Sequence, residues 1–468
     1  MKNKFFKNKR ITVMGLGIIG GGAGVVKFLV KNGARVLVTD LKTEEKLKES
    51  LQKIKKLPLE LILGKHRKKD FTDTDLIIKN PGVPDNSPYL KIARKYGIPV
   101  DTDIGIFFQL CQAQIIAVTG TKGKSTVVIL IHHLLKPKYP HVVLAGNIGN
   151  SPLESFEKIT KKSKIILELS SWQLEGLALH KKSPQIAVIT NIYRDHLNRY
   201  KSFKDYINSK KIIFRLQEPN DILLLNYDDL IVRKFSQLAN SHVYFFSREK
   251  TPQESVACFL KDKNIFFGNE KNPICSVIDL NINGEHNISN VLAAVSVAKL
   301  CRISSKIIKK ALKSFKGISF RQEFIREVKG VKYFNDTTAT IPQATEVAIK
   351  TLKQKFPDTK LILIAGGEDK NLNYRDLAKE IKRSTSHLVL LSGTASNKIK
   401  EELFRLGYFD EKKLIMADSM LKAVKEAKKL ANKSAIVILS PGAASFNLFK
   451  NEFDRGEQFN EIVKKMKT

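Results

Sequence analysis

Seven consecutive residues have the types and spacing that bind nucleotide phosphates. They lie between an apolar strand expected at 115–118 and a helix expected at 124–135, and they are Gly120, Thr121, Lys122, Gly123, Lys124, Ser125 and Thr126. Backbone N–H groups at such a turn point at phosphate oxygens. Lys124 is expected to neutralise the β- and γ-phosphates of ATP, and Ser125 to offer a hydroxyl to Mg²⁺. The first glycine of the common pattern is replaced by Val118, so a strand–helix turn without a ligand remains the alternative.

Three further side chains could complete a metal-assisted site. Glu168 lies near the end of an apolar strand expected at 165–169, and Asp195-His196 follows another strand. Polar groups at the carboxyl ends of parallel strands face the crevice where α/β proteins bind ligands, and Mg²⁺ prefers oxygen ligands. Taken alone, Glu168 could equally be a solvated strand end, His196 a structural histidine and Lys210 a surface lysine on a helix.

A second glycine-rich turn lies near the N-terminus. The residues from Gly15 to Gly20 read Gly-Leu-Gly-Ile-Ile-Gly, follow an expected strand and open an expected helix, and Asp40 ends the next strand. This pattern meets the dinucleotide-binding fingerprint. It indicates that a phosphate-bearing group can approach the backbone, and NAD, FAD and a UDP-sugar all satisfy it. The phosphate loop downstream weakens a dehydrogenase interpretation, because a nicotinamide enzyme does not need one.

The elements that must position these residues follow an α/β pattern. Short apolar strands alternate with helical stretches, which predicts helices layered on mainly parallel sheets. The strands fall into three series, at 11–14, 35–39 and 76–78, then at 115–118, 165–169, 186–189 and 222–225, and finally at 361–365, 388–391 and 436–439. A helix is expected to begin at Ser87-Pro88. Three domains are predicted, over residues 1–108, 109–316 and 317–468.

Composition limits the partners. The net charge is +35, from 81 Lys and Arg against 46 Asp and Glu, but the lysines are dispersed without a basic tail. A solvated surface that attracts polyanionic small substrates is therefore expected, with a nucleic-acid-binding ATPase as the alternative. No apolar stretch reaches the roughly 18 residues of a membrane-spanning helix. The basic start before residues 11–30 mimics a secretory signal, yet the glycines and Lys27 favour a retained strand, turn and helix.

The cysteines indicate a reducing compartment. Cys111, Cys258, Cys275 and Cys301 are scattered and form no Cys-x-x-Cys pair. This argues against a disulfide framework and against a cysteine zinc site. A cytoplasmic location is expected.

Together these motifs resemble the Mur ligase family, and within it the glutamate-adding type. The resemblance covers essentially the whole chain, in the family's order, with matching segments at 119–126, 168–173, 191–200, 210, 284–290, 315–321, 335–336, 366–370 and 440–445. Members that add the third or later residues, and the folate-polyglutamate relatives, lack the N-terminal glycine motif. The alanine-adding type has a histidine-containing motif in place of 335–340.

The resemblance implies a fold and an activity. The implied fold has an N-terminal Rossmann-like domain that binds UDP, a central P-loop ATPase-like domain that binds ATP, and a C-terminal Rossmann-like domain that binds glutamate. The implied reaction is ATP-dependent addition of glutamate to UDP-N-acetylmuramoyl-L-alanine through an acyl phosphate, in cytoplasmic peptidoglycan precursor synthesis. D-Glutamate is expected and L-glutamate is the alternative. ATP and two Mg²⁺ ions are expected, with a monomeric protein and neither a membrane nor a nucleic acid as partner.

The resemblance also implies the roles of individual residues. The catalytic set is Lys124, Glu168, His196 and Lys210, and the metal set is Ser125, Glu168, His196 and a carbamylated Lys210. The nucleotide set adds Asn287, Asn290, Arg321 and Asp336 to the phosphate loop. The UDP-substrate set is Gly15, Leu16, Gly17, Ile18, Asp40, Asn80, Gly82, Asn147 and Ser170. The glutamate set is Thr340, Lys370, Ser445 and Phe446.

Two residues depart from the family pattern near the amino-acid end. Thr338 stands where a lysine is usual, and Glu452 stands where a phenylalanine is usual. Both leave the ATP chemistry untouched and leave the choice between D- and L-glutamate open. A UDP-sugar-binding protein with a degenerate ligase site is a further alternative, and the intact Lys124, Glu168, His196 and Lys210 argue against it.

Overall fold

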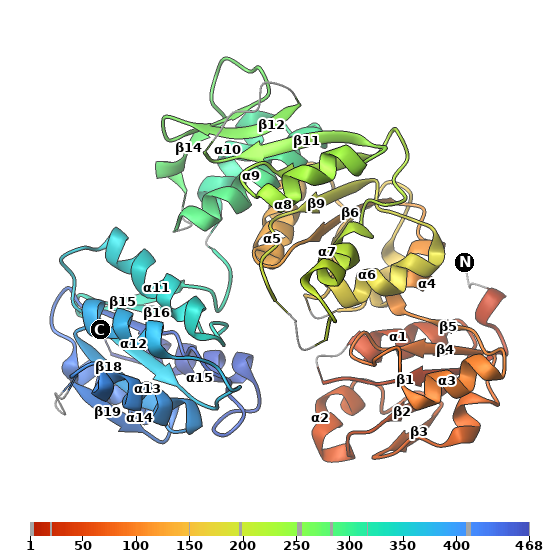
Figure 1. Cartoon of the computed structure of the whole chain (residues 1–468), viewed down its shortest axis with the longest axis horizontal. Helices are drawn as coiled ribbons and strands as arrows, with labels where there is room; N and C mark the ends of the chain where they lie inside the picture. The colour runs from red at the N-terminus through yellow and green to blue at the C-terminus, as the bar shows by residue number, and fades with distance from the viewer. Residues whose placement is uncertain are drawn as a thin grey trace. The chain divides into compact units, whose positions relative to one another are not determined.

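The computed structural model describes residues 4–18, 21–148, 150–195, 199–249, 255–280, 284–315, 317–408 and 413–467. The chain forms two compact units, of which the first comprises 1–280 with 285–315 and the second 281–284 with 316–468. The first unit contains two sheets and the second unit one, all flanked by helices (Figure 1). The predicted α/β fold with three mainly parallel sheets is therefore confirmed.

The first sheet carries five parallel strands in the order β3-β2-β1-β4-β5. Its strands are β1 (Arg10–Met14), β2 (Arg35–Asp40), β3 (Leu59–Leu63), β4 (Leu76–Lys79) and β5 (Val100–Asp101). The helices of this part are α1 (Gly21–Lys31), α2 (Glu44–Gln52), α3 (Pro88–Lys95) and α4 (Asp103–Leu110). The strand order reverses between β1 and β4, which is where open α/β sheets bind ligands.

The second sheet carries nine strands in the order β14-β13-β12-β11-β10-β9-β6-β8-β7, in which the β12–β13 and β13–β14 pairs are antiparallel and the other pairs are parallel. Its strands are β6 (Gln114–Thr119), β7 (Val142–Gly146), β8 (Lys164–Glu168), β9 (Ile186–Ile189), β10 (Ile222–Asn226), β11 (His242–Ser247), β12 (Val256–Lys261), β13 (Asn264–Phe267) and β14 (Cys275–Ser276). Its helices are α5 (Lys124–Leu135), α6 (Ser171–Leu177), α7 (Phe203–Lys211), α8 (Leu230–Arg233), α9 (Glu285–Leu300) and α10 (Ser305–Ser314). Helix α5 packs against α9.

The second unit has six strands in the order β15-β16-β20-β17-β18-β19, with β15 antiparallel at one edge. Its strands are β15 (Glu323–Val328), β16 (Val331–Asn335), β17 (Leu361–Gly366), β18 (His387–Leu391), β19 (Leu414–Ala417) and β20 (Ile436–Leu439). Its helices are α11 (Pro342–Lys355), α12 (Arg375–Ser384), α13 (Thr394–Arg405), α14 (Met420–Leu430) and α15 (Glu452–Lys464).

Short 3₁₀ helices complete the secondary structure, at η1 (Lys4–Phe6), η2 (Lys68–Phe71), η3 (Pro152–Lys158), η4 (Ala178–His180), η5 (Lys234–Leu238) and η6 (Val277–Asp279). None of the helices within the described ranges is long and apolar enough to span a bilayer. The domain boundary predicted at 108 falls inside α4, and that predicted at 316 adjoins the division between the two units.

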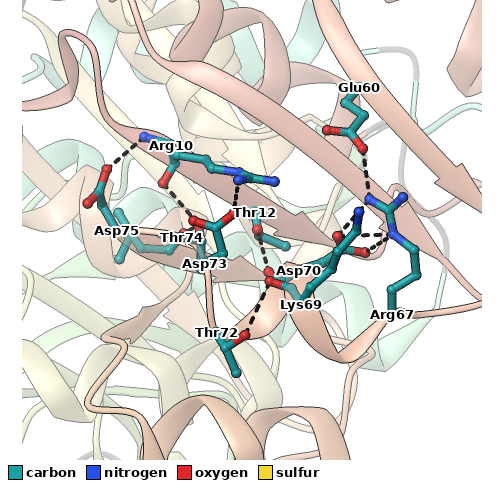
Figure 2. Close-up of polar contacts among 11 residues, drawn as sticks. Arg10, Thr12, Glu60, Arg67, Lys69, Asp70, Thr72, Asp73, Thr74 and Asp75 are labelled. Atoms are coloured by element: carbon teal, nitrogen blue, oxygen red, sulfur yellow. Dashed lines mark hydrogen bonds and ion pairs between the residues drawn. The ribbon is translucent and has the colours of Figure 1, made fainter.

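Polar contacts tie the segment before β4 to strand β1 (Figure 2). The Thr12 hydroxyl donates to the Asp70 carbonyl over 2.8 Å, and the Asp70 carboxylate accepts from Arg67 Nε over 2.9 Å. The Arg10 backbone N–H donates to Asp75 Oδ2 over 2.8 Å. The buried Asp70 is thus paired with a cation and anchored to the sheet. These bonds hold β4 in register beside β1.

The parts of the first unit that carry its two sheets pack closely on one another. The rings of Phe28 in α1 and Phe156 in η3 lie 5.6 Å apart, centroid to centroid, and Lys27 Nζ lies 2.9 Å from Glu154 Oε1. Helix α6 approaches the start of α4 so closely that only hydrogen fits at Gly176. The cavity described below depends on this junction, because residues of both parts line it.

Gly176→Ala tests the junction. A Cβ there would lie 2.6 Å from Thr102 Cγ2 and Oγ1, so we expect the variant to lose about 1–3 kcal/mol of unfolding free energy through overpacking. Urea unfolding followed by circular dichroism measures the loss. Gly21→Ala is the matched control, because nothing lies within 4 Å of its Cβ and it also occupies a helix. Equal stability of the Gly176 variant and the parent protein would contradict the close approach.

Candidate active site

The phosphate loop joins β6 to α5, as predicted, and its geometry requires glycine at two positions. Gly120 has φ 146° and Gly123 has φ 85°, the second of these at the N-cap of α5. A Cβ on Gly120 would lie 2.0 Å from Thr190 Oγ1, and one on Gly123 would lie 2.3 Å from Asn290 Oδ1. Neighbouring side chains therefore pack directly against the backbone of this loop. Glycine is therefore required here by close packing, and the N–H groups at the N-terminus of α5 are the ones that phosphate oxygens would approach.

Lys124 and Asn191 hold the loop in shape. Lys124 Nζ donates to the carbonyls of Gly120 and Thr121, each over 2.9 Å. The Asn191 carbonyl accepts from the Thr121 N–H, and its side-chain oxygen accepts from the Lys122 N–H, both over 2.8 Å. The ammonium of Lys124 thus lies against the loop, where it can meet a phosphate. Ser125 and Thr126 occupy the first turn of α5.

Lys210 in α7 is buried beside this loop, with 2% of its surface exposed. Its Nζ donates to the Gly120 carbonyl over 3.0 Å and to Thr119 Oγ1 over 3.3 Å. Burial, and then the neighbouring Lys124 charge, lower the pKa of Lys210 well below its ordinary value. The alternative of a surface lysine is therefore wrong. A lysine in this environment loses its proton more easily than an exposed one, and a neutral amine is the form that reacts with CO₂.

Glu168 ends β8 and is also buried, with 2% of its surface exposed. Asn147 Nδ2 donates to its Oε1 over 2.8 Å, whereas its Oε2 is buried without a hydrogen-bond partner among the described residues. The alternative of a solvated strand end is therefore wrong. A buried carboxylate oxygen without a partner is the kind of atom that a hard cation satisfies.

The described residues fit Mg²⁺ better than a metal that is held by protein ligands alone. Among them, no group of three or more His, Cys, Asp and Glu side chains could hold a metal ion. Mg²⁺ does not need such a group, because it keeps several waters and is commonly bound by one or two carboxylates together with substrate phosphates. The predicted ligand His196 lies outside the described residues.

A cavity of about 460 Å³ extends from this site to the first sheet. Four lysines of the described residues line it, Lys42, Lys79, Lys124 and Lys210, and Asp103 is the single acidic residue that the structure describes there. Burial raises the pKa of the Asp103 carboxyl, which weakens its negative charge in the cavity. The predicted residues that the structure places in the lining are Gly15, Gly17, Ile18, Asn80, Gly82, Lys124, Asn147, Ser170 and Lys210. Such a lining favours a polyanionic ligand.

The glycine-rich turn after β1 is organised by Asp40. The Leu16 and Gly17 N–H groups donate to Asp40 Oδ2 over 2.9 and 3.3 Å, and the Lys42 N–H donates to Oδ1 over 2.9 Å. Two amides that a dinucleotide motif would offer to phosphate are therefore already paired. Across the strand-order reversal, a Cβ on Gly15 would lie 3.0 Å from Asn80 Cβ. The turn thus shapes one wall of the cavity, with Asp40 and Leu16 buried behind it.

The predicted nucleotide residues divide between the two units. Asn290 in α9 is buried against Gly123 of the phosphate loop, and its Nδ2 donates to Asn287 Oδ1 over 3.0 Å. Arg321 and Asp336 belong to the second unit. Asp336 accepts from Ser440 Oγ over 2.7 Å and from the Gln322 N–H over 3.1 Å, and burial raises the pKa of Asp336 to about 7.

The predicted glutamate residues follow neighbouring strands of the second unit. Thr340 follows β16, Lys370 follows β17, and Ser445 and Phe446 follow β20, which lies between those strands. The three strands are parallel, so these residues gather at one edge of the sheet. The Ser445 hydroxyl is buried without a partner among the described residues, whereas Lys370 and Phe446 are exposed.

Sequence reasoning missed two aromatic residues of the cavity lining. Tyr206 is buried, and its hydroxyl lies 3.1 Å from Thr121 Oγ1 in the phosphate loop. Its position four residues before Lys210 places both on one face of α7, a spacing that could have identified it. Trp172 also lines the cavity and lies within the predicted segment 168–173, where it received no role of its own.

Comparison with protein families finds three matching segments in the order of the three sheets. A MurD-like N-terminal domain of the Mur ligases matches residues 9–102, a Mur ligase middle domain matches 118–298, and a Mur ligase glutamate ligase domain matches 320–442.

Individual relatives match along the whole chain. Proteins named UDP-N-acetylmuramoylalanine–D-glutamate ligase from Roseiflexus sp. (strain RS-1) and Borreliella burgdorferi (strain ZS7) are 40% and 38% identical, and each alignment covers at least 97% of both chains. Among solved structures, UDP-N-acetylmuramate-alanine ligase MurC from Thermotoga maritima superposes with a TM-score of 0.66 at 20% identity, covering 98% of this chain and 100% of that one. At that identity the likeness concerns the fold alone.

Asp336→Asn tests the raised pKa. The folded state holds the Asp336 proton up to about pH 7, whereas the unfolded state releases it near 3.8, so the carboxyl makes the protein less stable as pH rises between these values. We expect the variant to gain stability over the parent protein across this window, by at most about 1.4 kcal/mol per pH unit. Urea unfolding from pH 4 to pH 8 measures the difference.

The amide can still accept the Gln322 N–H, so the fold should tolerate the change. Asp376→Asn is the control, because that carboxyl is exposed. A stability difference that does not vary with pH would show that Asp336 titrates normally.

Proposed function

The chain belongs to the Mur ligase family, and from that premise we propose that it is an ATP-dependent ligase that adds D-glutamate to UDP-N-acetylmuramoyl-L-alanine in peptidoglycan precursor synthesis. The observation that carries the proposal is the arrangement of the partly buried Lys124 and the buried Glu168 and Lys210 around a phosphate loop, at a cavity lined by lysines. The relatives at 40% and 38% identity, which are named for D-glutamate, favour it over L-glutamate.

The reaction has two steps. An oxygen of the alanyl carboxylate attacks the γ-phosphorus of ATP, the bond from that phosphorus to the bridging oxygen breaks, and ADP leaves with an acyl phosphate formed. The amine of D-glutamate then attacks the acyl carbon and loses a proton, and inorganic phosphate leaves with the electrons of the C–O bond. Lys124 offsets the negative charge on the phosphoryl group during transfer.

Mg²⁺ would be held by Ser125, Glu168, His196 and a carbamylated Lys210, and two ions are proposed. Bound there, Mg²⁺ supplies positive charge next to the transferring phosphoryl group. The buried Glu168 Oε2 without a partner supports this role. The lowered pKa of Lys210 supports carbamylation, in which the neutral amine attacks CO₂ and loses a proton to leave an anion.

The substrate is proposed to run along the cavity in the first unit. Its uridine end lies at Gly15–Ile18, Asp40, Asn80 and Gly82, and its muramoyl-alanine end at Asn147 and Ser170. ATP is proposed to contact Asn287, Asn290, Arg321 and Asp336 besides the phosphate loop. We propose that the domain over residues 1–108 binds UDP, that the domain over 109–316 binds ATP, and that the domain over 317–468 binds glutamate. A monomer in the cytoplasm is proposed.

The amino-acid end carries the two departures from the family pattern. Thr338 Oγ1 donates to the Phe320 carbonyl over 2.8 Å, so the hydroxyl is engaged with the backbone. Glu452 is the first residue of α15. Glutamate is proposed to bind at Thr340, Lys370, Ser445 and Phe446, with Lys370 pairing a carboxylate.

Phosphate release tests the proposed substrates. We expect release from ATP only when UDP-N-acetylmuramoyl-L-alanine and D-glutamate are both present, because each step needs its own nucleophile. L-Glutamate, UDP-N-acetylmuramate without alanine, and a folate serve as comparison substrates, and DNA tests the nucleic-acid alternative. Turnover that prefers L-glutamate would change the amino acid in the proposal, and turnover with a folate or DNA in place of the sugar nucleotide would overturn it.

Lys210→Ala tests the carbamate. We expect a loss of activity of about 100-fold or more, because the variant lacks the anion that holds a metal ion. Added short carboxylic acids should restore part of the activity by filling the space with a carboxylate. Lys211→Ala, on the next residue of the same helix, is the control and should remain active. Full activity of the Lys210 variant without added acid would contradict the carbamate.

A further inference from the structure

Trp172 is the single tryptophan of the chain, and it lines the cavity. It lies in the first turn of α6, two residues after Ser170 and four residues after Glu168. Its side chain is half-buried, so part of the indole remains accessible. None of the catalytic or binding roles proposed above uses this residue.

The backbone under Trp172 is held rigidly. The Gln173 N–H donates to Ser170 Oγ over 3.3 Å, and the Ser170 N–H donates to Gln173 Oε1 over 3.1 Å. This reciprocal pair is a capping box, which satisfies two N–H groups at the start of a helix. On its other side α6 approaches Thr102 through Gly176. Contacts therefore fix both ends of α6, the short helix that carries Trp172.

Arg199 holds the ring itself. The Arg199 guanidinium lies 4.3 Å from the centroid of the Trp172 ring, and its NH2 group lies 3.1 Å from Glu175 Oε2. The Tyr200 hydroxyl donates to Glu175 Oε1 over 2.7 Å. Glu175 is three residues after Trp172, so both lie on one face of α6. The carboxylate thus fixes the guanidinium, and the guanidinium fixes the indole through a cation–π contact.

We infer that Trp172 contacts the N-acetylmuramoyl sugar of the substrate and that Arg199 is the positioning residue that orients its ring. This inference rests on the proposed function. Among the described residues, the aromatic ones in the cavity lining are Trp172 and Tyr206, and Tyr206 is 1% exposed with its hydroxyl 3.1 Å from Thr121 Oγ1 of the phosphate loop. The indole is therefore the aromatic surface of the lining that a ligand can cover.

The position of Trp172 favours contact with the sugar of the substrate over contact with its uracil base. Trp172 follows β8, which pairs with β6, the strand that leads into the phosphate loop, whereas the turn after β1 belongs to the other sheet that contributes to the lining. A sugar offers both C–H groups, which pack on an aromatic ring, and hydroxyl groups, which the neighbouring polar side chains can bond. Since the uridine end is proposed to lie at the turn after β1, the part of the substrate nearer the phosphate loop is the sugar.

Intrinsic fluorescence tests the contact, because all tryptophan emission comes from Trp172. UDP-N-acetylmuramoyl-L-alanine is expected to change the intensity or the wavelength of the emission, with a midpoint that matches its Kd from calorimetry. UDP alone is expected to leave the emission unchanged. Calorimetric binding of the sugar nucleotide without any change in emission would overturn this inference and leave the proposed function intact. Absence of calorimetric binding would overturn the proposed function itself.

Variants separate contact from positioning. Trp172→Ala is expected to raise the KM for the sugar nucleotide about threefold to tenfold, with the KM for ATP unchanged, and Trp172→Phe to raise it less. Arg199→Lys is expected to shift the emission of the ligand-free protein and to raise the same KM. Arg233→Lys is the control, because that guanidinium lies 4.7 Å from the Tyr227 ring outside the cavity lining. Parental emission and KM in the Arg199 variant would overturn its positioning role.

Discussion

The arrangement of the active site depends on a lysine ammonium buried next to a second lysine. Lys210 lies beneath the phosphate loop, with Lys124 close enough to lower its pKa further than burial alone. Its direct contacts are the Gly120 carbonyl and Thr119 Oγ1, which are neutral acceptors. Removing a cation from water without a paired anion is costly. Anions bound at the site would offset this cost. A carbamate on Lys210, the ATP phosphates and an acyl phosphate would each supply negative charge.

Sheet topology brings the phosphate loop and the negatively charged side chains close to Lys210. Strand β6 lies between β8 and β9, so the phosphate loop, Glu168 and the segment leading to Asp195 emerge at one edge of the sheet. Helix α9, which is distant in the sequence, completes the loop because Asn290 fills the space that a side chain at Gly123 would need. The same rule places Gly15 beside Asn80 in the first sheet, where the strand order reverses. The cavity connects the two places.

The strands that were predictable from sequence are mostly buried, whereas most of the missed strands are partly exposed, with the buried β16 as an exception. Each predicted strand is present within one residue at each end, and α5 has the predicted bounds, because these segments are continuous apolar runs or begin at a glycine turn. Strand β3 was missed because its residues are exposed or half-exposed at an edge, and the β12–β14 segment was missed because few of its residues are buried. Single side chains were harder. The burial of Lys210, the pairing of Asp40 with the glycine turn, and the Arg199 contact with Trp172 all depend on residues far apart in the sequence.

Two buried polar atoms of the proposed sites share one property that no motif conveys. Glu168 Oε2 at the end of β8 and Ser445 Oγ after β20 are both buried without a hydrogen-bond partner among the described residues. Native proteins satisfy nearly all such atoms, since each unsatisfied one costs about 1–3 kcal/mol. A fold retains the cost where a ligand completes the bond, and these two atoms lie at strand ends of different sheets, where α/β proteins bind ligands. The proposed metal and glutamate sites thus each contain a buried polar atom that a bound ligand would satisfy.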